Sequence, residues 1–134
     1  MYKKIPLNLV KITPSKTIKD AMQLLNSIEE SFLLVVTKDK KLLGTITDGD
    51  IRRAMLKGIN IDKKVEYCMN KRPITSNKVD KEISFLFNKM TSTDKFLPII
   101  STEKKVLSIL LENSEKIERT ALVMAGGYGK RLGK

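Results

Sequence analysis

An internal repeat limits the fold of this chain more than any other feature. The segments 12–18 (Ile-Thr-Pro-Ser-Lys-Thr-Ile) and 74–80 (Ile-Thr-Ser-Asn-Lys-Val-Asp) are similar and lie about 60 residues apart. Each is followed by apolar residues at helical spacing, which predicts an amphipathic helix packed on one side. One unit of roughly 60 residues would bury too little surface to be stable alone. We therefore expect two units that pack against each other.

Two pairs of apolar runs follow the predicted helices. The first pair is 32–36 and 42–47, the second is 96–100 and 106–111, and a polar turn separates the runs of each pair. Runs of this length and composition predict buried strand hairpins. We therefore predict a mixed α/β (α+β) fold with two β-α-β-β-α repeats, at 1–62 and 63–118, packed as a pseudo-twofold pair.

Composition excludes several classes of protein. No apolar run approaches the roughly 18 residues of a membrane span, and the start of the chain lacks the apolar region of a signal peptide. A single cysteine, Cys68, cannot form an intrachain disulfide, so we expect a cytoplasmic protein. Without histidine, neither a zinc site nor a histidine-based triad is expected, and we predict no metal site. The net charge of +11 favours anionic partners, but the lysines are scattered, so nucleic acid is not the expected partner.

The most informative loop is 44–53 (Gly-Thr-Ile-Thr-Asp-Gly-Asp-Ile-Arg-Arg). A predicted strand ends at Thr47, and a helix begins at Asp48 to Asp50. One interpretation is purely structural, because Asp48 is a suitable N-cap and Asp50 in the first turn favours the helix dipole. This interpretation requires no ligand.

The second interpretation of the same loop is a nucleotide site. Gly44 would leave room for a flat ring to approach the backbone. The hydroxyl of Thr47 and the free N–H groups of the new helix can hold a phosphate. Asp50 can accept both hydroxyls of a ribose. Arg52 and Arg53 supply cationic groups for phosphate.

The pattern Gly-x-Ile-Thr-x-x-Asp-Ile at 44–51 resembles the cystathionine-β-synthase (CBS) domain, and the repeated unit over 1–118 resembles a paired CBS, or Bateman, module. The resemblance implies that AMP, ADP or ATP binds in a cleft between the copies, and that the modules form homodimers. It assigns the phosphate side to Thr47 and the ribose to Asp50. The base pocket implied by the resemblance is lined by Thr13, Ile18, Gly44, Thr45 and Ile46.

The second copy departs from the family pattern. The positions equivalent to Gly44, Thr47 and Asp50 are Ser108, Leu111 and Ser114. Both the ribose carboxylate and the phosphate hydroxyl are therefore missing there, and we expect one competent site at most.

The last residues carry another motif. An apolar run at 121–125 leads into Gly-Gly-Tyr-Gly-Lys-Arg-Leu at 126–132. This resembles the Ala-Gly-Gly-x-Gly-x-Arg-Leu signature that opens nucleoside-triphosphate:sugar-phosphate nucleotidyltransferases, although a flexible Gly/Lys-rich end is an alternative. The resemblance implies that residues 119–134 begin a transferase domain that is cut short. The implied triphosphate loop contains Gly126, Gly127, Gly129, Lys130 and Arg131.

Two functions remain open at this point. In the first, the CBS pair binds an adenine nucleotide and regulates a fused nucleotidyltransferase, which makes an NDP-sugar and pyrophosphate from an NTP and a sugar 1-phosphate. In the second, it is a ligand-free dimerisation module of the same enzyme. In that transferase family the catalytic residues follow the glycine loop, so these 134 residues are not expected to be an enzyme or to hold a cofactor. Mg²⁺ is expected only for the longer parent.

Overall fold

The computed structural model describes residues 2–77, 82–90 and 95–112. The elements of the first half are β1 (Tyr2–Ile5), the 3₁₀ helix η1 (Leu7–Leu9), β2 (Lys11–Ile12), α1 (Ile18–Ser27), β3 (Phe32–Val36), β4 (Leu42–Thr47) and α2 (Asp48–Leu56). Those of the second half are η2 (Val65–Tyr67), α3 (Glu82–Lys89), β5 (Phe96–Ile100) and β6 (Val106–Glu112). From β2 to α2 the first repeat thus has the predicted order β-α-β-β-α, and β1 precedes it. The last element of the second repeat and the predicted transferase segment lie outside the described residues.

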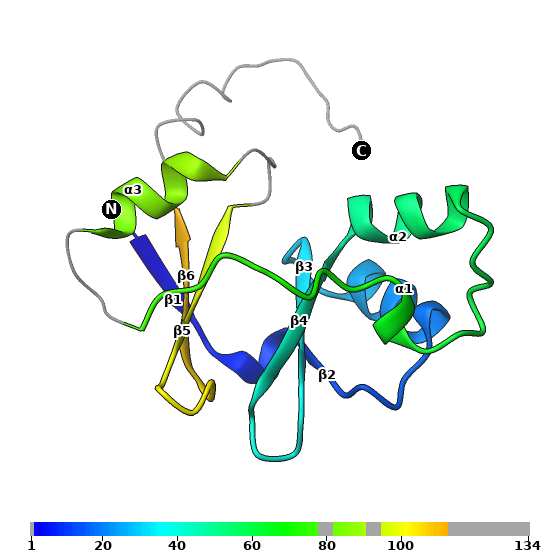
Figure 1. Ribbon diagram of the computed structural model, residues 1–134, viewed down its shortest axis with the longest axis horizontal. Helices are drawn as coiled ribbons and strands as arrows, with labels where there is room; N and C mark the ends of the chain where they lie inside the picture. The colour runs from blue at the N-terminus through cyan, green and yellow to red at the C-terminus, as the bar shows by residue number, and fades with distance from the viewer. Residues whose placement is uncertain (1, 78–81, 91–94, 113–134) are drawn as a thin grey trace.

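Two three-stranded sheets lie side by side (Figure 1). The first has the order β2-β3-β4, with β2 parallel and β4 antiparallel to β3. The second has the order β1-β6-β5, and all its pairs are antiparallel. Both predicted hairpins are present, and this arrangement confirms the predicted mixed fold. However, β1 from the start of the chain pairs with β6, so the sheets do not follow the sequence boundary at residue 62.

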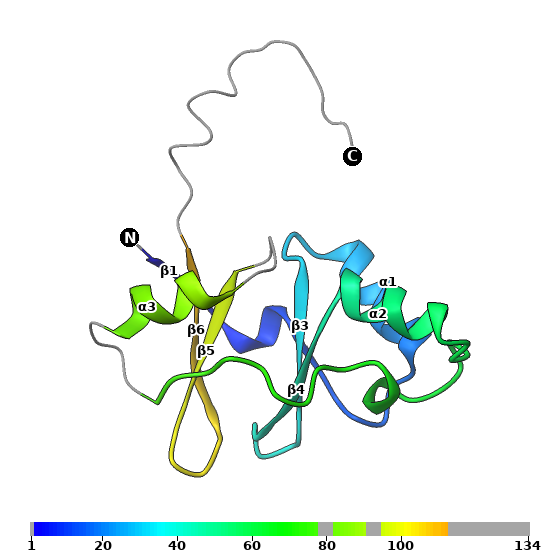
Figure 2. The same ribbon diagram turned by 45° about the horizontal axis from the view of Figure 1, so that its top comes forward.

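The core has three layers. Two of them lie on opposite faces of the central strand β3. Phe32, Leu34 and Val36 point between the two sheets, whereas Leu33 and Val35 point toward α1 and α2. All five residues are buried, which is typical of a strand with both faces covered. The third layer packs α3 on the second sheet and contains Ile83, Phe87, Leu97, Ile99 and Leu110. Both views show α1 and α2 on the far side of the first sheet from the second (Figures 1 and 2).

Aromatic stacking joins the two repeats directly. The rings of Phe32 in β3 and Phe96 in β5 are parallel within 3°, with centroids 3.9 Å apart. These residues occupy equivalent positions at the starts of the two predicted hairpins. The contact fixes the separation of the sheets at the end where β4 runs into α2.

Helix α2 begins at Asp48, within the predicted range, but its N-cap lies one residue earlier than predicted. The N-cap is Thr47, whose hydroxyl accepts a hydrogen bond from the backbone N–H of Asp50, so the prediction of Asp48 as N-cap is wrong. Thr47 has the extended backbone that an N-cap requires, whereas Asp48 is already helical. Helix α1 has the same device, with Thr17 as N-cap and Asp20 as its partner. Such reciprocal pairs satisfy two backbone N–H groups at the start of a helix.

Candidate functional site

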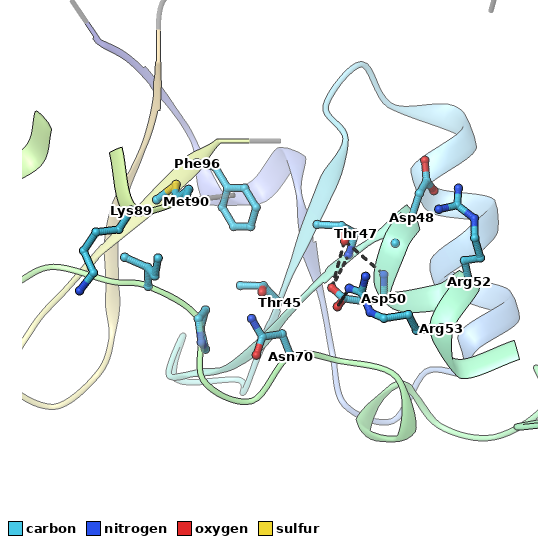
Figure 3. Close-up of a pocket in the computed structure, with 13 residues that line it drawn as sticks. Thr45, Thr47, Asp48, Asp50, Arg52, Arg53, Asn70, Lys89, Met90 and Phe96 are labelled. Carbon is cyan, nitrogen blue, oxygen red and sulfur yellow. Dashed lines mark hydrogen bonds and ion pairs between the residues drawn. The ribbon is translucent and has the colours of Figure 1, made fainter. Parts of the chain in front are cut away.

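A cleft of about 760 Å³ lies between the two repeats. One side is formed by the end of β4 and the first turns of α2, and the other by the end of α3 and the start of β5 (Figure 3). The segment that connects the repeats closes the space between them. The cleft is lined by Thr45, Thr47, Asp48, Gly49, Asp50, Arg52, Arg53, Asn70, Pro73, Ile74, Lys89, Met90 and Phe96.

Five of the residues predicted from sequence line this cleft. They are Thr45, Thr47, Asp50, Arg52 and Arg53. They meet there because β4 ends where α2 begins, so the strand residues and the first helical turns share one edge. Thr45 is the most buried of the five, at 2% exposure, and its hydroxyl has no hydrogen-bond partner among the described residues. A buried hydroxyl without a partner is available to a ligand.

Four other predicted residues do not line the cleft. Ile18 and Ile46 are buried in the core layer beneath α1 and α2, where their burial contributes to folding. Thr13 is exposed, and its hydroxyl is 3.1 Å from that of Ser15. Gly44 has no free space beside it.

The connecting segment passes directly over Gly44. A Cβ atom added at this glycine would lie 2.7 Å from the carbonyl oxygen of Asn70 and 2.9 Å from the sulfur of Met69. Two backbone hydrogen bonds join the next residue to the same segment, from Thr45 N to Asn70 O at 3.0 Å and from Asn70 N to Thr45 O at 2.7 Å. The missing side chain therefore admits the protein's own backbone, and the predicted room for a flat ring is filled.

The carboxylate of Asp50 is the best-connected group in the cleft. Its Oδ2 accepts hydrogen bonds from the backbone N–H of Thr47 at 2.9 Å and from the Thr47 hydroxyl at 3.1 Å. Its Oδ1 accepts a hydrogen bond from Arg53 Nη2 at 2.8 Å. Figure 3 shows these contacts as dashed lines at the start of α2. The same carboxylate thus caps the helix and lines the cleft, so the two interpretations of the loop are compatible.

Sequence reasoning missed the residues that the rest of the chain contributes. Asn70 and Pro73 come from the connecting segment, and Lys89, Met90 and Phe96 from the second repeat. Figure 3 shows Met90 and Phe96 on the opposite side of the cleft from Asp50 and Arg53, with the Lys89 side chain extending away from them. No motif marks these residues, and their only sequence signal is their place in or beside predicted elements. Of the equivalents in the second copy, Leu111 packs against the layer between the sheets, and Ser114 lies outside the described residues.

Cys68 packs in the core between the first sheet and its helices, and its thiol is unreactive. Burial raises the pKa of its thiol to about 11, and the charge of Asp50 adds to the effect. The thiol is therefore protonated at neutral pH and is a poor nucleophile. In the described part of the chain, no three potential metal ligands of the types His, Cys, Asp and Glu lie together. Nor does any described helix have the length and apolar character needed to cross a bilayer.

Comparison with known proteins identifies the fold. Residues 4–57 match the family model of the CBS domain. The CBS domain pair of protein MJ0100, solved with 5′-methylthioadenosine and S-adenosyl-L-methionine, is 25% identical, with a TM-score of 0.64 over 87% of this chain and 88% of that one. A CBS domain protein of Streptococcus pneumoniae TIGR4 is 18% identical, with a TM-score of 0.69 over 88% of this chain and 77% of that one. The chain therefore has the fold of a CBS domain pair.

Curated relatives extend well beyond the matched region. Two proteins of Helicobacter pylori, from strains J99 and 26695, are 32% identical to this chain over 73 residues, and each is described as an uncharacterized protein. The match covers 54% of this chain but only 22% of each relative.

Proposed function

We propose that this chain is a regulatory CBS pair that binds an adenine nucleotide in the cleft between its repeats. The observation that carries the proposal is the cleft itself, where Asp50 and Arg53 face apolar side chains of the other repeat. The MJ0100 pair, solved with two compounds that contain adenosine, supports an adenosine ligand.

Each part of a nucleotide has a suitable counterpart in the cleft. The apolar side chains of Ile74, Met90 and Phe96 suit the faces of a purine. The carboxylate of Asp50 suits the ribose hydroxyls. Arg52 and the N-terminal turn of α2 suit the phosphate, because guanidinium groups and free helix N–H groups both favour anions.

Calorimetric titration of AMP, ADP and ATP tests the proposal. Asp50→Asn should weaken nucleotide binding by about 1–3 kcal/mol, because a neutral amide accepts the ribose hydrogen bonds less well. Asp20→Asn is the matched control, since Asp20 has the same position in the capping box of α1 and does not line the cleft. Equal affinities for the two variants would contradict the ribose assignment, and absence of heat with all three nucleotides would contradict the proposal.

The regulated activity that we propose is that of a sugar-phosphate nucleotidyltransferase fused to the pair. This part rests on the glycine motif at 126–132, which lies outside the described residues. Sugar-nucleotide formation by the complete protein with Mg²⁺, measured with and without AMP, is the direct test. A complete protein without this activity, or one indifferent to AMP, would contradict the regulatory link.

We also propose that the pair forms a homodimer through its helices. Large apolar side chains are exposed on α2 and α3, with Leu56 at 80%, Phe85 at 62% and Met55 at 49%. Leu56→Glu should shift the mass measured by light scattering from dimer toward monomer. A dimer that binds no nucleotide would favour the alternative function, a ligand-free dimerisation module.

A further inference from the structure

The ion pair between Arg53 and Asp50 occupies the group that a ribose would use. Arg53 Nη2 lies 2.8 Å from Asp50 Oδ1, and the other carboxylate oxygen already accepts two hydrogen bonds from Thr47. A carboxylate offers about four acceptor positions. Three are taken, so a ribose that presents two hydroxyls requires one of the present donors to leave.

Arg53 is the donor that can leave most easily. Its side chain is 66% exposed, whereas that of Asp50 is only 13% exposed. The bonds from Thr47 form the cap of α2, and breaking them would leave the start of the helix unsatisfied. An exposed ion pair between residues three apart on a helix contributes little to stability, so Arg53 can turn away without disturbing the fold.

The guanidinium of Arg53 also lies close to the first turn of α2, where a phosphate could bind. A Cβ atom added at Gly49 would lie 3.2 Å from Arg53 Nη1 and 3.5 Å from Nη2. The Arg53 side chain thus folds back over the first turn of α2, where a side chain at position 49 would crowd it. Free N–H groups at the start of a helix attract phosphate, so a phosphate bound there would meet the guanidinium close to its present position.

From this geometry we infer that Arg53 makes the cleft selective for nucleotides over nucleosides by exchanging Asp50 for a ligand phosphate. The inference rests on the proposed function. A nucleoside displaces Arg53 from Asp50 and gives the guanidinium no new partner. A nucleotide displaces it and supplies a phosphate in return. Arg53 therefore opposes adenosine and favours AMP.

Calorimetry with AMP and adenosine on wild type and Arg53→Gln tests the exchange. The variant should bind adenosine about two- to fivefold more tightly, because an exposed ion pair no longer has to be broken. It should bind AMP about tenfold more weakly, because a charge-assisted phosphate contact is lost. Effects of opposite sign on the two ligands are the signature. A variant that weakens both ligands, or leaves both unchanged, would overturn the exchange and leave the proposed function intact.

Two further variants keep the test specific. Arg72→Gln removes the same charge from an exposed arginine that does not line the cleft, so both affinities should stay within twofold of wild type. Gly49→Ala crowds the folded-back guanidinium and should also raise the affinity for adenosine. If the wild type binds neither AMP nor adenosine, the proposed function and the exchange are both overturned. Circular dichroism of each variant verifies that the fold is retained.

Discussion

The backbone carbonyl of Lys104 accepts a hydrogen bond of 2.9 Å from the backbone N–H of Leu42. A reciprocal bond of the same length runs from the N–H of Val106 to the carbonyl of Lys40. The tips of the two hairpins are thereby joined, and the first sheet is tied to the second. Lys40 and Lys104 adopt positive φ angles of 70° and 69° to make these bonds.

Substitution of Lys40 should therefore affect stability through its backbone. Lys40→Val should lower the free energy of unfolding by about 1–2 kcal/mol, because a β-branched residue resists the left-handed region. Lys40→Gly should not lower it, since glycine adopts positive φ without steric cost. Urea denaturation measures both. Lys38→Val, in the same turn but without a positive φ, is the control and should change stability by less than about 0.5 kcal/mol.

Gly44 should tolerate no side chain. Gly44→Ala places a methyl group 2.7 Å from the carbonyl oxygen of Asn70, so the connecting segment has to shift at a cost of about 1–3 kcal/mol in unfolding free energy. Gly49→Ala is the matched comparison, because its methyl group meets only the flexible end of Arg53. Thermal denaturation should show a clear loss for the first variant and little change for the second. Equal melting temperatures would contradict the close passage at Gly44.

The two capping boxes allow stability and binding to be separated. Thr47→Ala and Thr17→Ala each remove a capping hydroxyl, and each should lower the unfolding free energy by about 1 kcal/mol. Only Thr47 lines the cleft, so only Thr47→Ala should weaken AMP binding measured by calorimetry. Thr47→Ser keeps the hydroxyl and should retain both properties. Equal loss of AMP affinity in the Thr17 and Thr47 variants would show that the effect is a general loss of stability.

Cys68 should make stability depend on alkaline pH. Burial raises the pKa of its thiol in the folded state from 9.0 to about 11. The folded state therefore retains a proton that the unfolded state releases, and the thiol's contribution is complete below pH 9 and declines as the pH rises toward about 11. Cys68→Ala should lose stability less steeply over this interval. Parallel curves of unfolding free energy against pH for wild type and Cys68→Ala would contradict the raised pKa.

Local sequence patterns predicted most of the fold. The strands at Phe32–Val36 and Phe96–Ile100 have the predicted bounds because polar turns interrupt each apolar run. The one-sided helices after segments 12–18 and 74–80 were also predicted, since burial on one side imposes helical spacing on apolar residues. The pairing of β1 with β6 was not predicted, because contact between distant segments leaves no periodic pattern in either one.

Only the residues that the first repeat contributes to the candidate site were predicted. The residues Thr47, Asp50 and Arg53 are close in sequence, so one loop is enough to place them together. Asn70 and Lys89 reach the same cleft through tertiary packing, which a single sequence does not reveal. Gly44 was assigned to a ligand because a glycine indicates close approach without saying what approaches.

The pairing of Tyr2 with Glu112 has a consequence for synthesis on the ribosome. The strands of the first sheet all lie between Lys11 and Thr47, so that sheet can form while later residues are still being translated. At about 5–20 residues per second, β1 then waits several seconds for its partner strand to emerge. Lys3 and Lys4 are exposed in the middle of β1. Their charges oppose pairing of the waiting strand with a neighbouring nascent chain.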